Sequence, residues 1–206
     1  MMGKTHLAVG MAVALVGLKN ENITGVNDCL IALAGGALGG AIPDIDILDN
    51  CKTHDAPLGE SVAFGLLLIA AVIDYFTKGE MCSNILNNKT LAAAGLIGFI
   101  LLSIKGYFSK HREFTHSILS LILFSFSVWL IYKPLGFAFA LGFISHLALD
   151  SLNKREIKLF YPSDSGICFR ICGANGLCNT LFMILGFIAA TALFIEKIWY
   201  IIKNSI

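Results

Sequence analysis

The chain has 206 residues, of which 56% are hydrophobic and 14% are charged, and its mean hydropathy is +0.77. Soluble domains carry roughly 25% charged residues, so this chain has too few charges to cover a water-soluble globule of its size, which indicates a membrane protein. The net charge of +1 excludes the strongly basic surface by which proteins bind duplex nucleic acid. At this length we expect one domain over residues 1–206.

Seven apolar segments follow one another along the chain and predict an all-α fold. They cover residues 6–18, 29–42, 61–76, 90–104, 116–132, 134–152 and 180–202. Alternation of period two is absent, and Ala, Leu and Gly dominate, which is typical of helices. Most segments are shorter than the ~20 residues that cross a hydrocarbon core. We therefore expect a polytopic membrane bundle of about six or seven helices, some short or only partly spanning.

The first two segments have distinct signals. The apolar run at residues 7–18 has no clear small-residue cleavage site after it, which favours a retained helix over a signal peptide. Residues 33–40 read Leu-Ala-Gly-Gly-Ala-Leu-Gly-Gly. Small residues let helix backbones approach closely in a membrane. Because no Gly-Lys-Ser/Thr follows, tight helix packing is favoured over a phosphate-binding loop.

Three polar residues at the ends of these segments are candidate metal ligands. Asp44 and Asp46 follow the second segment in the sequence Pro-Asp-Ile-Asp. Two carboxylates so placed can share one cation, or one can bind the metal while the other activates water. The alternative is a helix end followed by solvated acids. His6 opens the first segment, where its ring either points back into a site or has a structural role.

The densest polar stretch is Lys-His-Arg-Glu-Phe-Thr-His-Ser at residues 110–117. His111 and His116 bring two imidazoles to the mouth of the fifth segment, a density that a metal or phosphate site explains and a membrane helix does not need. Arg112 either clamps a phosphate in bidentate geometry or is an ordinary juxtamembrane cation. Thr115 is expected to cap the fifth helix.

His146 and Asp150 lie four residues apart near the end of the sixth segment. On a helix this spacing puts both side chains on one face, where nitrogen and oxygen donors suit zinc, manganese or iron. A structural His–Asp hydrogen bond gives the same pattern. The apolar surroundings favour a site, because ionisable groups inside membrane helices are costly and usually mark one.

The candidate ligands converge if all seven segments cross the membrane. The N-terminus and the loops at 43–60, 105–115 and 153–179 then share one side, which holds every candidate ligand. That side also carries nine of the fifteen basic residues. Because positive residues favour the cytoplasm, we expect the site to face the cytoplasm.

The predicted metal set comprises seven residues: His6, Asp44, Asp46, His111, His116, His146 and Asp150. Seven donors exceed the four of one tetrahedral zinc, which predicts either two ions or one ion with catalytic carboxylates. The catalytic residues are predicted to be Asp46, His111 and Arg112. A carboxylate would orient or deprotonate the attacking water, and Arg112 would offset charge on the phosphoryl oxygens.

Taken in order, these motifs resemble the YdjM-like family of bacterial and archaeal inner-membrane proteins, which are described as metal-dependent hydrolases. Residues 158–162 (Lys-Leu-Phe-Tyr-Pro) resemble the family's "LLWP" segment, with Tyr161 where Trp is usual. The resemblance covers about residues 3 to 165. Four further motifs carry it: THxxxG at Thr5, His6 and Gly10; PDID at residues 43–46; HRxxTHS at residues 111–117; and SHxxxD at Ser145, His146 and Asp150.

The resemblance implies a multi-pass protein of the cell inner membrane. The family is distantly similar to the all-helical zinc-dependent phospholipases C and single-strand nucleases. The ligands implied on that basis are His6, Asp44, His111 or His116, His146 and Asp150. The Glu expected near the end of the pattern is missing after Pro162, where Asp164 is the nearby acid, which speaks against a full three-zinc cluster.

The favoured hypothesis is a membrane-bound hydrolase that cleaves a phosphoester, of a lipid or lipid-linked substrate, with water activated by one or two divalent ions. The metal is expected to be zinc, with manganese or iron as alternatives. A metal-ion or proton transporter is one alternative; it requires polar residues at mid-depth with access from both sides, whereas these cluster at one side. A non-catalytic scaffold with a structural metal is the other.

The cysteines form no CxxC pair. Cys168, Cys172 and Cys178 lie close enough in sequence to hold a metal or form one disulfide. The favoured interpretation is that they are small apolar residues in a reducing compartment.

Overall fold

The computed structural model describes residues 1–46, 56–77, 79–173 and 176–205, and these ranges contain helices and no strand. The predicted all-α fold is confirmed. The α-helices are listed here in chain order: α1 (Gly3–Gly17), α2 (Val26–Ala41), α3 (Ala56–Thr77), α4 (Glu80–Asn87), α5 (Lys89–Tyr107), α6 (Ile118–Ile131), α7 (Lys133–Ser151) and α8 (Leu177–Ser205). Short 3₁₀ turns η1 (Asn20–Asn22), η2 (Ile42–Asp46) and η3 (Phe114–His116) lie between them.

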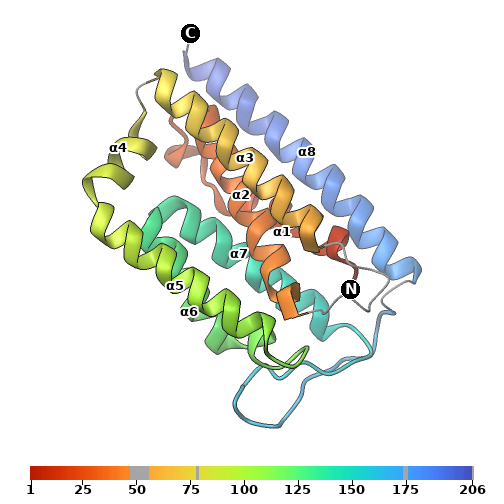
Figure 1. Cartoon of the computed structure of the whole chain (residues 1–206). Coiled ribbons are helices and arrows are strands. Elements are labelled where there is room, and N and C mark those ends of the chain that lie inside the picture. Colours follow the sequence, from red (N-terminus) through yellow and green to blue (C-terminus); the bar gives the residue numbers. More distant parts are fainter. Residues whose placement is uncertain (47–55, 78, 174–175, 206) are drawn as a thin grey trace.

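The seven long helices correspond to the seven apolar segments, and α4 is an additional short helix in the connection between α3 and α5. Its sequence, Glu-Met-Cys-Ser-Asn-Ile-Leu-Asn, is too polar to stand out in a hydropathy pattern. The long helices run up and down the bundle, so the N-terminus and the C-terminus lie at opposite ends of the molecule (Figure 1). The helix α2 packs against α1, α3 and α7, while α8 covers α1 and α6 packs between α5 and α7.

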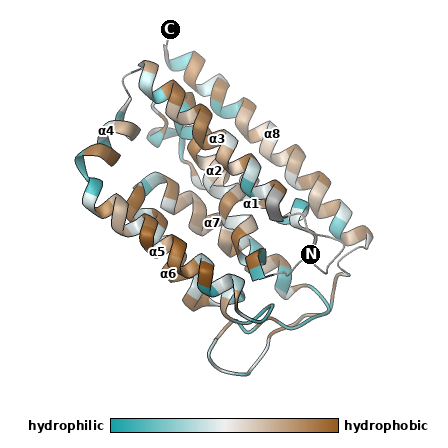
Figure 2. Cartoon of the chain, in the orientation of Figure 1, coloured by the Kyte–Doolittle hydropathy of each residue, from teal (hydrophilic) through white to brown (hydrophobic). Residues whose placement is uncertain are grey.

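Five helical stretches are long and apolar enough to cross a membrane: Val26–Asp46, Leu58–Thr77, Lys89–Tyr107, Lys133–Ser151 and Leu177–Asn204. The helices α1 and α6 are apolar but shorter, with 15 and 14 residues, as predicted for part of the bundle. The helices α3, α5 and α8 expose much of their apolar surface, whereas α2 and α7 are mostly buried inside the protein. Figure 2 shows apolar residues along the length of α3, α5 and α8. An apolar exterior of this kind is the surface that lipid covers.

Glycines allow the central helices to touch backbone to backbone, as the run at residues 33–40 predicted. A Cβ on Gly36 would overlap the carbonyl oxygen of Gly10 on α1, and a Cβ on Gly142 of α7 would overlap the carbonyl oxygen of Gly36. A Cβ on Gly40 would lie 2.5 Å from the carbonyl oxygen of His6. Packing through small residues is a main source of helix association in membranes. It also fixes the α1 backbone at His6 relative to the end of α2.

We predict that Gly36→Ala destabilises the protein by about 1–3 kcal/mol, because the backbone atoms it would meet cannot move aside without shifting α1. Thermal unfolding of the purified protein in detergent measures the effect. Gly65→Ala is the matched control on α3, where an added Cβ meets nothing within 4 Å. The control should be neutral or slightly stabilising, since Ala is the better helix former. Equal loss of stability in both variants would contradict the packing described here.

Candidate metal centre

Side chains from separate elements meet at the end of the bundle that holds the N-terminus. All seven residues predicted as metal ligands lie there, together with Arg112. Their positions are His6 on α1, Asp44 and Asp46 on η2, His111 and Arg112 in the loop before η3, His116 on η3, and His146 and Asp150 on α7. The structure thus brings together residues that are up to 144 positions apart in the chain (6 to 150). Apart from the partly exposed His111 and Arg112, all of them are buried.

The Nε2 atoms of His116 and His146 and the carboxylates of Asp44 and Asp150 surround one point. The two Nε2 atoms are 3.3 Å apart. Asp44 Oδ1 lies 3.6 Å from the His116 Nε2 and 3.7 Å from the His146 Nε2, and Asp150 Oδ2 lies 3.6 Å from the His116 Nε2. Donors bound tetrahedrally to one zinc at ~2.0–2.1 Å are about 3.3–3.4 Å from one another. The spacing therefore matches that of donors around a shared ion.

Hydrogen bonds fix which nitrogen of each ring faces that point. The Nδ1 of His146 donates to the carbonyl oxygen of Gly40 at 2.8 Å, which leaves its Nε2 as the atom with a lone pair. The Nδ1 of His116 lies 3.0 Å from the Thr115 hydroxyl and 3.5 Å from Asp46 Oδ2. A histidine whose second nitrogen is bound to a carbonyl or carboxylate is the usual arrangement around a protein-bound metal. Nothing in the sequence predicted that the Gly40 carbonyl oxygen would orient His146.

His6 supplies the observation that tests whether a metal fits. Its ring is fully buried and stacks on His146 with 3.7 Å between the ring centroids. Neither ring nitrogen has a hydrogen-bond partner, although the Nε2 lies 3.2 Å from Asp150 Oδ1. Leaving a buried polar atom unsatisfied costs about 1–3 kcal/mol. A cation beside Asp150 would satisfy the Nε2, so the residues present fit a bound metal.

The negative charge at this point is met in part by cationic groups of the chain. The carboxylates of Asp44, Asp46 and Asp150 are all buried, and buried carboxylates require compensating charge. The Arg112 Nη2 lies 3.2 Å from Asp150 Oδ2, and the α-amino group of Met1 contacts the same carboxylate.

The same carboxylates act on His116. Burial opposes its charged form, but hydrogen bonding to Asp150, Asp44 and Asp46 raises the pKa of His116 well above its usual value. The surroundings of this imidazole therefore favour positive charge at the centre of the cluster.

Asp46 contacts the Nδ1 atoms of His111 and His116 and does not face the point that the Nε2 atoms surround. Its Oδ1 lies 2.7 Å from the Nδ1 of His111, and its Oδ2 accepts from the Arg112 backbone N–H at 3.1 Å and from the Thr115 hydroxyl. Groups of donors that could hold one ion are formed by His6, Asp44 and His146, by Asp44, His111 and His116, and by His116, His146 and Asp150. Asp46 belongs to none of the groups found among the described residues.

The expectation that Thr115 caps the fifth helix is wrong. The residue that caps α6 is Ser117, whose hydroxyl accepts from the Ser120 backbone N–H at 3.1 Å. The hydroxyl of Thr115 is used at the site instead, between Asp46 and His116. Capping preferences alone do not separate two hydroxyl residues that are two positions apart.

Arg112 is held in an unusual backbone conformation at the rim of the site. Its φ is 70°, in the left-handed region that costs a non-glycine residue about 1–3 kcal/mol. Contacts on both sides maintain it: its N–H donates to Asp46, and its carbonyl oxygen accepts from the Lys158 backbone N–H at 3.0 Å. The Nη1 donates to the carbonyl oxygen of Arg155 at 2.9 Å. A cavity of about 390 Å³ lies beside it, and its lining combines the basic residues Arg112, Arg155 and Lys158 with the acids Glu113, Glu156 and Asp164.

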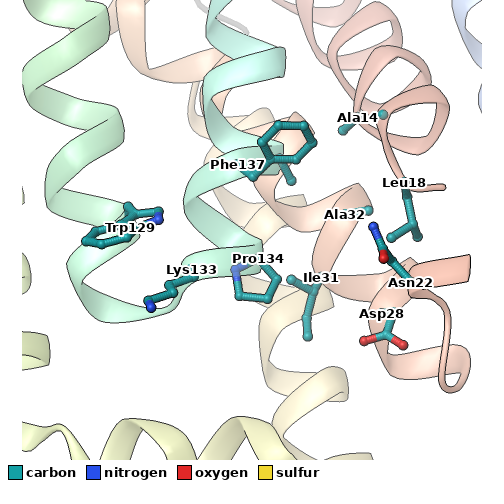
Figure 3. A pocket seen from close by; sticks show the side chains of 12 residues that line it. Ala14, Leu18, Asn22, Asp28, Ile31, Ala32, Trp129, Lys133, Pro134 and Phe137 are labelled. Carbon is teal, nitrogen blue, oxygen red and sulfur yellow. The ribbon is translucent and has the colours of Figure 1, made fainter.

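A different cavity lies at the opposite end of the bundle and has different chemistry. It measures about 390 Å³ and is formed where α1, α2 and α7 meet, with Asn22, Asp28 and Lys133 as its polar side chains (Figure 3). No group of histidines and acids that could hold a metal is found there within the described ranges. The groups of donors that could hold a metal, among the described residues, therefore lie at one end of the bundle.

The cysteines correct one interpretation. Cys172 and Cys178 form a disulfide, so the interpretation of all three as small apolar residues is wrong for these two. The thiol of Cys168 is free and donates to the carbonyl oxygen of Asn153. The disulfide joins Cys172, in the segment between α7 and α8, to the first turn of α8, at the same end of the bundle as the site.

Comparison with known proteins assigns the family. The model of the family described as YdjM inner membrane protein matches residues 1–203, almost the whole chain. The chain belongs to this family. No curated protein and no solved structure matches it. Membership in the YdjM family confirms the resemblance and the inner-membrane location, whereas the distant similarity to phospholipases C and single-strand nucleases stays a prediction.

We predict that His146→Ala removes most of the metal bound by this YdjM-family protein, because it deletes a donor at the shared point. Asp46→Asn should weaken metal binding by about 10–100-fold, the usual effect of losing a group that orients a ligand. Elemental analysis and chelator competition of the purified protein measure both. Glu113→Gln is the control, since this carboxylate pairs with Lys158 outside the cluster. Unchanged metal content in His146→Ala would contradict the site.

Proposed function

We propose that this protein is a membrane-bound hydrolase that uses one or two divalent ions to cleave a phosphoester. The observation that carries the proposal is the convergence of three histidines and two aspartates beside Arg112 at one end of a membrane bundle. The donors, imidazole nitrogens and carboxylate oxygens, suit zinc, with manganese or iron as alternatives. Such an ion lowers the pKa of a bound water and polarises a phosphoryl oxygen.

The metal ligands that we propose differ in one respect from the set predicted from sequence. We assign His6, Asp44, His116, His146 and Asp150 to the metal. His111 lies within reach of a second ion that shares Asp44 and His116. Asp46 becomes a positioning residue, because its oxygens are engaged by His111, Thr115 and the Arg112 backbone.

Arg112 and His111 lie where a substrate can reach them. The guanidinium carries a planar set of donors that matches phosphoryl oxygens, and it would offset the charge that develops on them. His111 is partly exposed; its Nδ1 is held by Asp46, and its Nε2 accepts from the Arg112 Nε at 3.3 Å. A histidine oriented by a carboxylate is suited to passing a proton to or from a reacting oxygen.

Hydrolysis is favoured over transport by the packing behind the site. Transport requires a path for ions to the opposite side. Directly behind the cluster, Gly36 contacts Gly10 on α1 and Gly142 on α7, backbone against backbone. This contact leaves no room for an aqueous path between these three helices. A closed structural metal site is disfavoured because more than the usual four protein donors converge and Arg112 points into the same cluster.

We predict phosphoester hydrolysis that a chelator abolishes and added zinc or manganese restores. Arg112→Ala should lower kcat/KM by about 10²–10³-fold, and His111→Gln by about 10²–10⁴-fold, with metal content retained in Arg112→Ala. Activity of the purified protein on a panel of phosphoesters measures this. Asp164→Asn, an exposed acid in the neighbouring loop, is the control. Full activity in Arg112→Ala would contradict its role, and metal flux into liposomes without hydrolysis would favour the transporter.

The orientation in the membrane that we propose reverses the sequence prediction. A nine-to-six excess of basic residues is a weak bias towards a cytoplasmic site. The disulfide between Cys172 and Cys178 lies at the same end as the site, and disulfides persist in oxidising compartments and are rare in the cytosol. We therefore propose that the site faces the non-cytoplasmic side of the inner membrane.

This orientation predicts that the C-terminus, at the opposite end of the bundle (Figure 1), lies in the cytoplasm. Green fluorescent protein fused there should fluoresce, and alkaline phosphatase fused at the same position should be inactive. The converse pair of results would place the site in the cytoplasm and contradict the proposal. A phosphatase fused after Ser109, in the loop at the site end, is the matched control and should be active.

A further inference from the structure

An apolar groove of about 480 Å³ lies between α3 and α5, away from both cavities described above. Its floor is formed by residues of α2, α6 and α7, such as Leu38, Val128 and Leu135. Only two of its thirteen lining residues, Glu60 and Ser103, are polar. A volume of this size is within the range of ~300–1,000 Å³ typical of small-molecule sites.

The turn η2, which carries Asp44 and Asp46, also forms part of the groove wall. Ile42 and Ile45 of η2 line its wall, and Asp44 and Asp46 of the same turn carry their carboxylates to the histidines. One short turn therefore separates the apolar groove from the metal ligands. A molecule that fills the groove lies directly beside the proposed site.

The polarity of the groove changes along its length. Glu60 near the start of α3 and Ser103 near the end of α5 lie at the site end, whereas Ile131 and Leu135 belong to the opposite end of the bundle. The hydroxyl oxygen of Ser103 is buried and has no hydrogen-bond partner, so it can donate to an oxygen of a bound molecule. The Ser103 hydroxyl thus favours a hydrogen-bond acceptor at the site end of the groove, and the rest of the lining favours a long apolar tail.

The groove also adjoins the surface that lipid covers. Phe64 on α3 and Leu96 on α5 line it and are 70% and 52% exposed. The helices α3 and α5 are joined through α4 at the end away from the site (Figure 1). A hydrocarbon chain can therefore enter sideways from the bilayer without crossing water.

We propose that this groove binds the hydrocarbon chain of a lipid-linked phosphoester and places its phosphoryl group at the metal centre. The inference rests on the proposed function and names its substrate class: an amphiphile with a phosphoester head and one long apolar chain. The occupant follows from the two properties above, an apolar groove open to lipid and a polar end that lies one short turn from the site.

Photolabelling tests the groove independently of catalysis. The full-length protein in lipid nanodiscs is labelled with hexadecyl phosphate that carries a diazirine on its chain, and the labelled residues are identified by mass spectrometry. The expected result is labelling of groove residues such as Leu67 and Leu96 that excess hexadecyl phosphate suppresses and excess hexadecane does not. Labelling that is spread evenly over the outer faces of α3, α5 and α8, or that no competitor suppresses, would show bulk lipid only and overturn the proposal.

Variants that fill the groove with a larger side chain test the same proposal through the rate of phosphoester hydrolysis. Leu67→Trp and Leu96→Trp should lower kcat/KM for a hexadecyl phosphoester by roughly tenfold or more, the scale on which apolar pockets discriminate, and leave a butyl phosphoester unaffected. The matched controls Leu68→Trp and Ile97→Trp lie one position along on the same helices, are exposed, and do not line the groove. Equal effects in both pairs, or equal loss for both substrates, would overturn the proposal.

The two proposals fail in different ways. If no phosphoester is hydrolysed but hexadecyl phosphate still suppresses the labelling, the proposed function fails and the groove remains a lipid site. If butyl phosphoester is hydrolysed in a metal-dependent reaction but the groove is not labelled, the hydrolase stands and the lipid substrate class is wrong.

Discussion

Buried negative charge is the constraint around which this end of the molecule is arranged. Asp44, Asp46 and Asp150 lie within a membrane bundle, where an uncompensated carboxylate is very costly. Three imidazoles, the guanidinium of Arg112 and a set of fixed hydrogen bonds surround these carboxylates and stabilise their charge. The unpartnered nitrogens of His6 show that these groups alone do not complete the network. A divalent ion beside Asp150 would satisfy the Nε2 of His6, and the orientation of the other histidines is already suited to one.

The site depends on packing that lies far from it in sequence. Gly40 allows the end of α2 to approach the backbone of His6, and its carbonyl oxygen holds His146. Thr5 donates to the Asn179 side chain at 2.9 Å, which ties the start of α1 to α8. Because the ligands come from α1, η2, η3 and α7, small shifts between these elements would separate the donors. The glycine contacts between α1, α2 and α7 keep those shifts small.

Much of the fold and the list of site residues could be predicted from the sequence, because both follow from local pattern. Hydropathy located the seven long helices, and the four-residue spacing of His146 and Asp150 put them on one face. The role of each residue could not be predicted. Asp44 and Asp46 are only two positions apart. The 3₁₀ turn η2 directs Asp44 towards the Nε2 of His116, at the shared centre, and Asp46 towards the Nδ1 atoms of His111 and His116. In the same way, Thr115 serves the site rather than capping α6 because its hydroxyl contacts Asp46, and Ser117 caps α6 instead.

X-ray absorption spectroscopy of the purified, zinc-loaded protein tests the central claim most directly. It reports the donor atoms and shows imidazole ligands by the scattering of their outer ring atoms. The account predicts a first shell of nitrogen and oxygen at ~2.0–2.1 Å, with the signature of about three imidazoles and no sulfur. A shell that contains sulfur, or oxygen without imidazole, would show that the ion binds elsewhere and would contradict the site built from His6, His116 and His146.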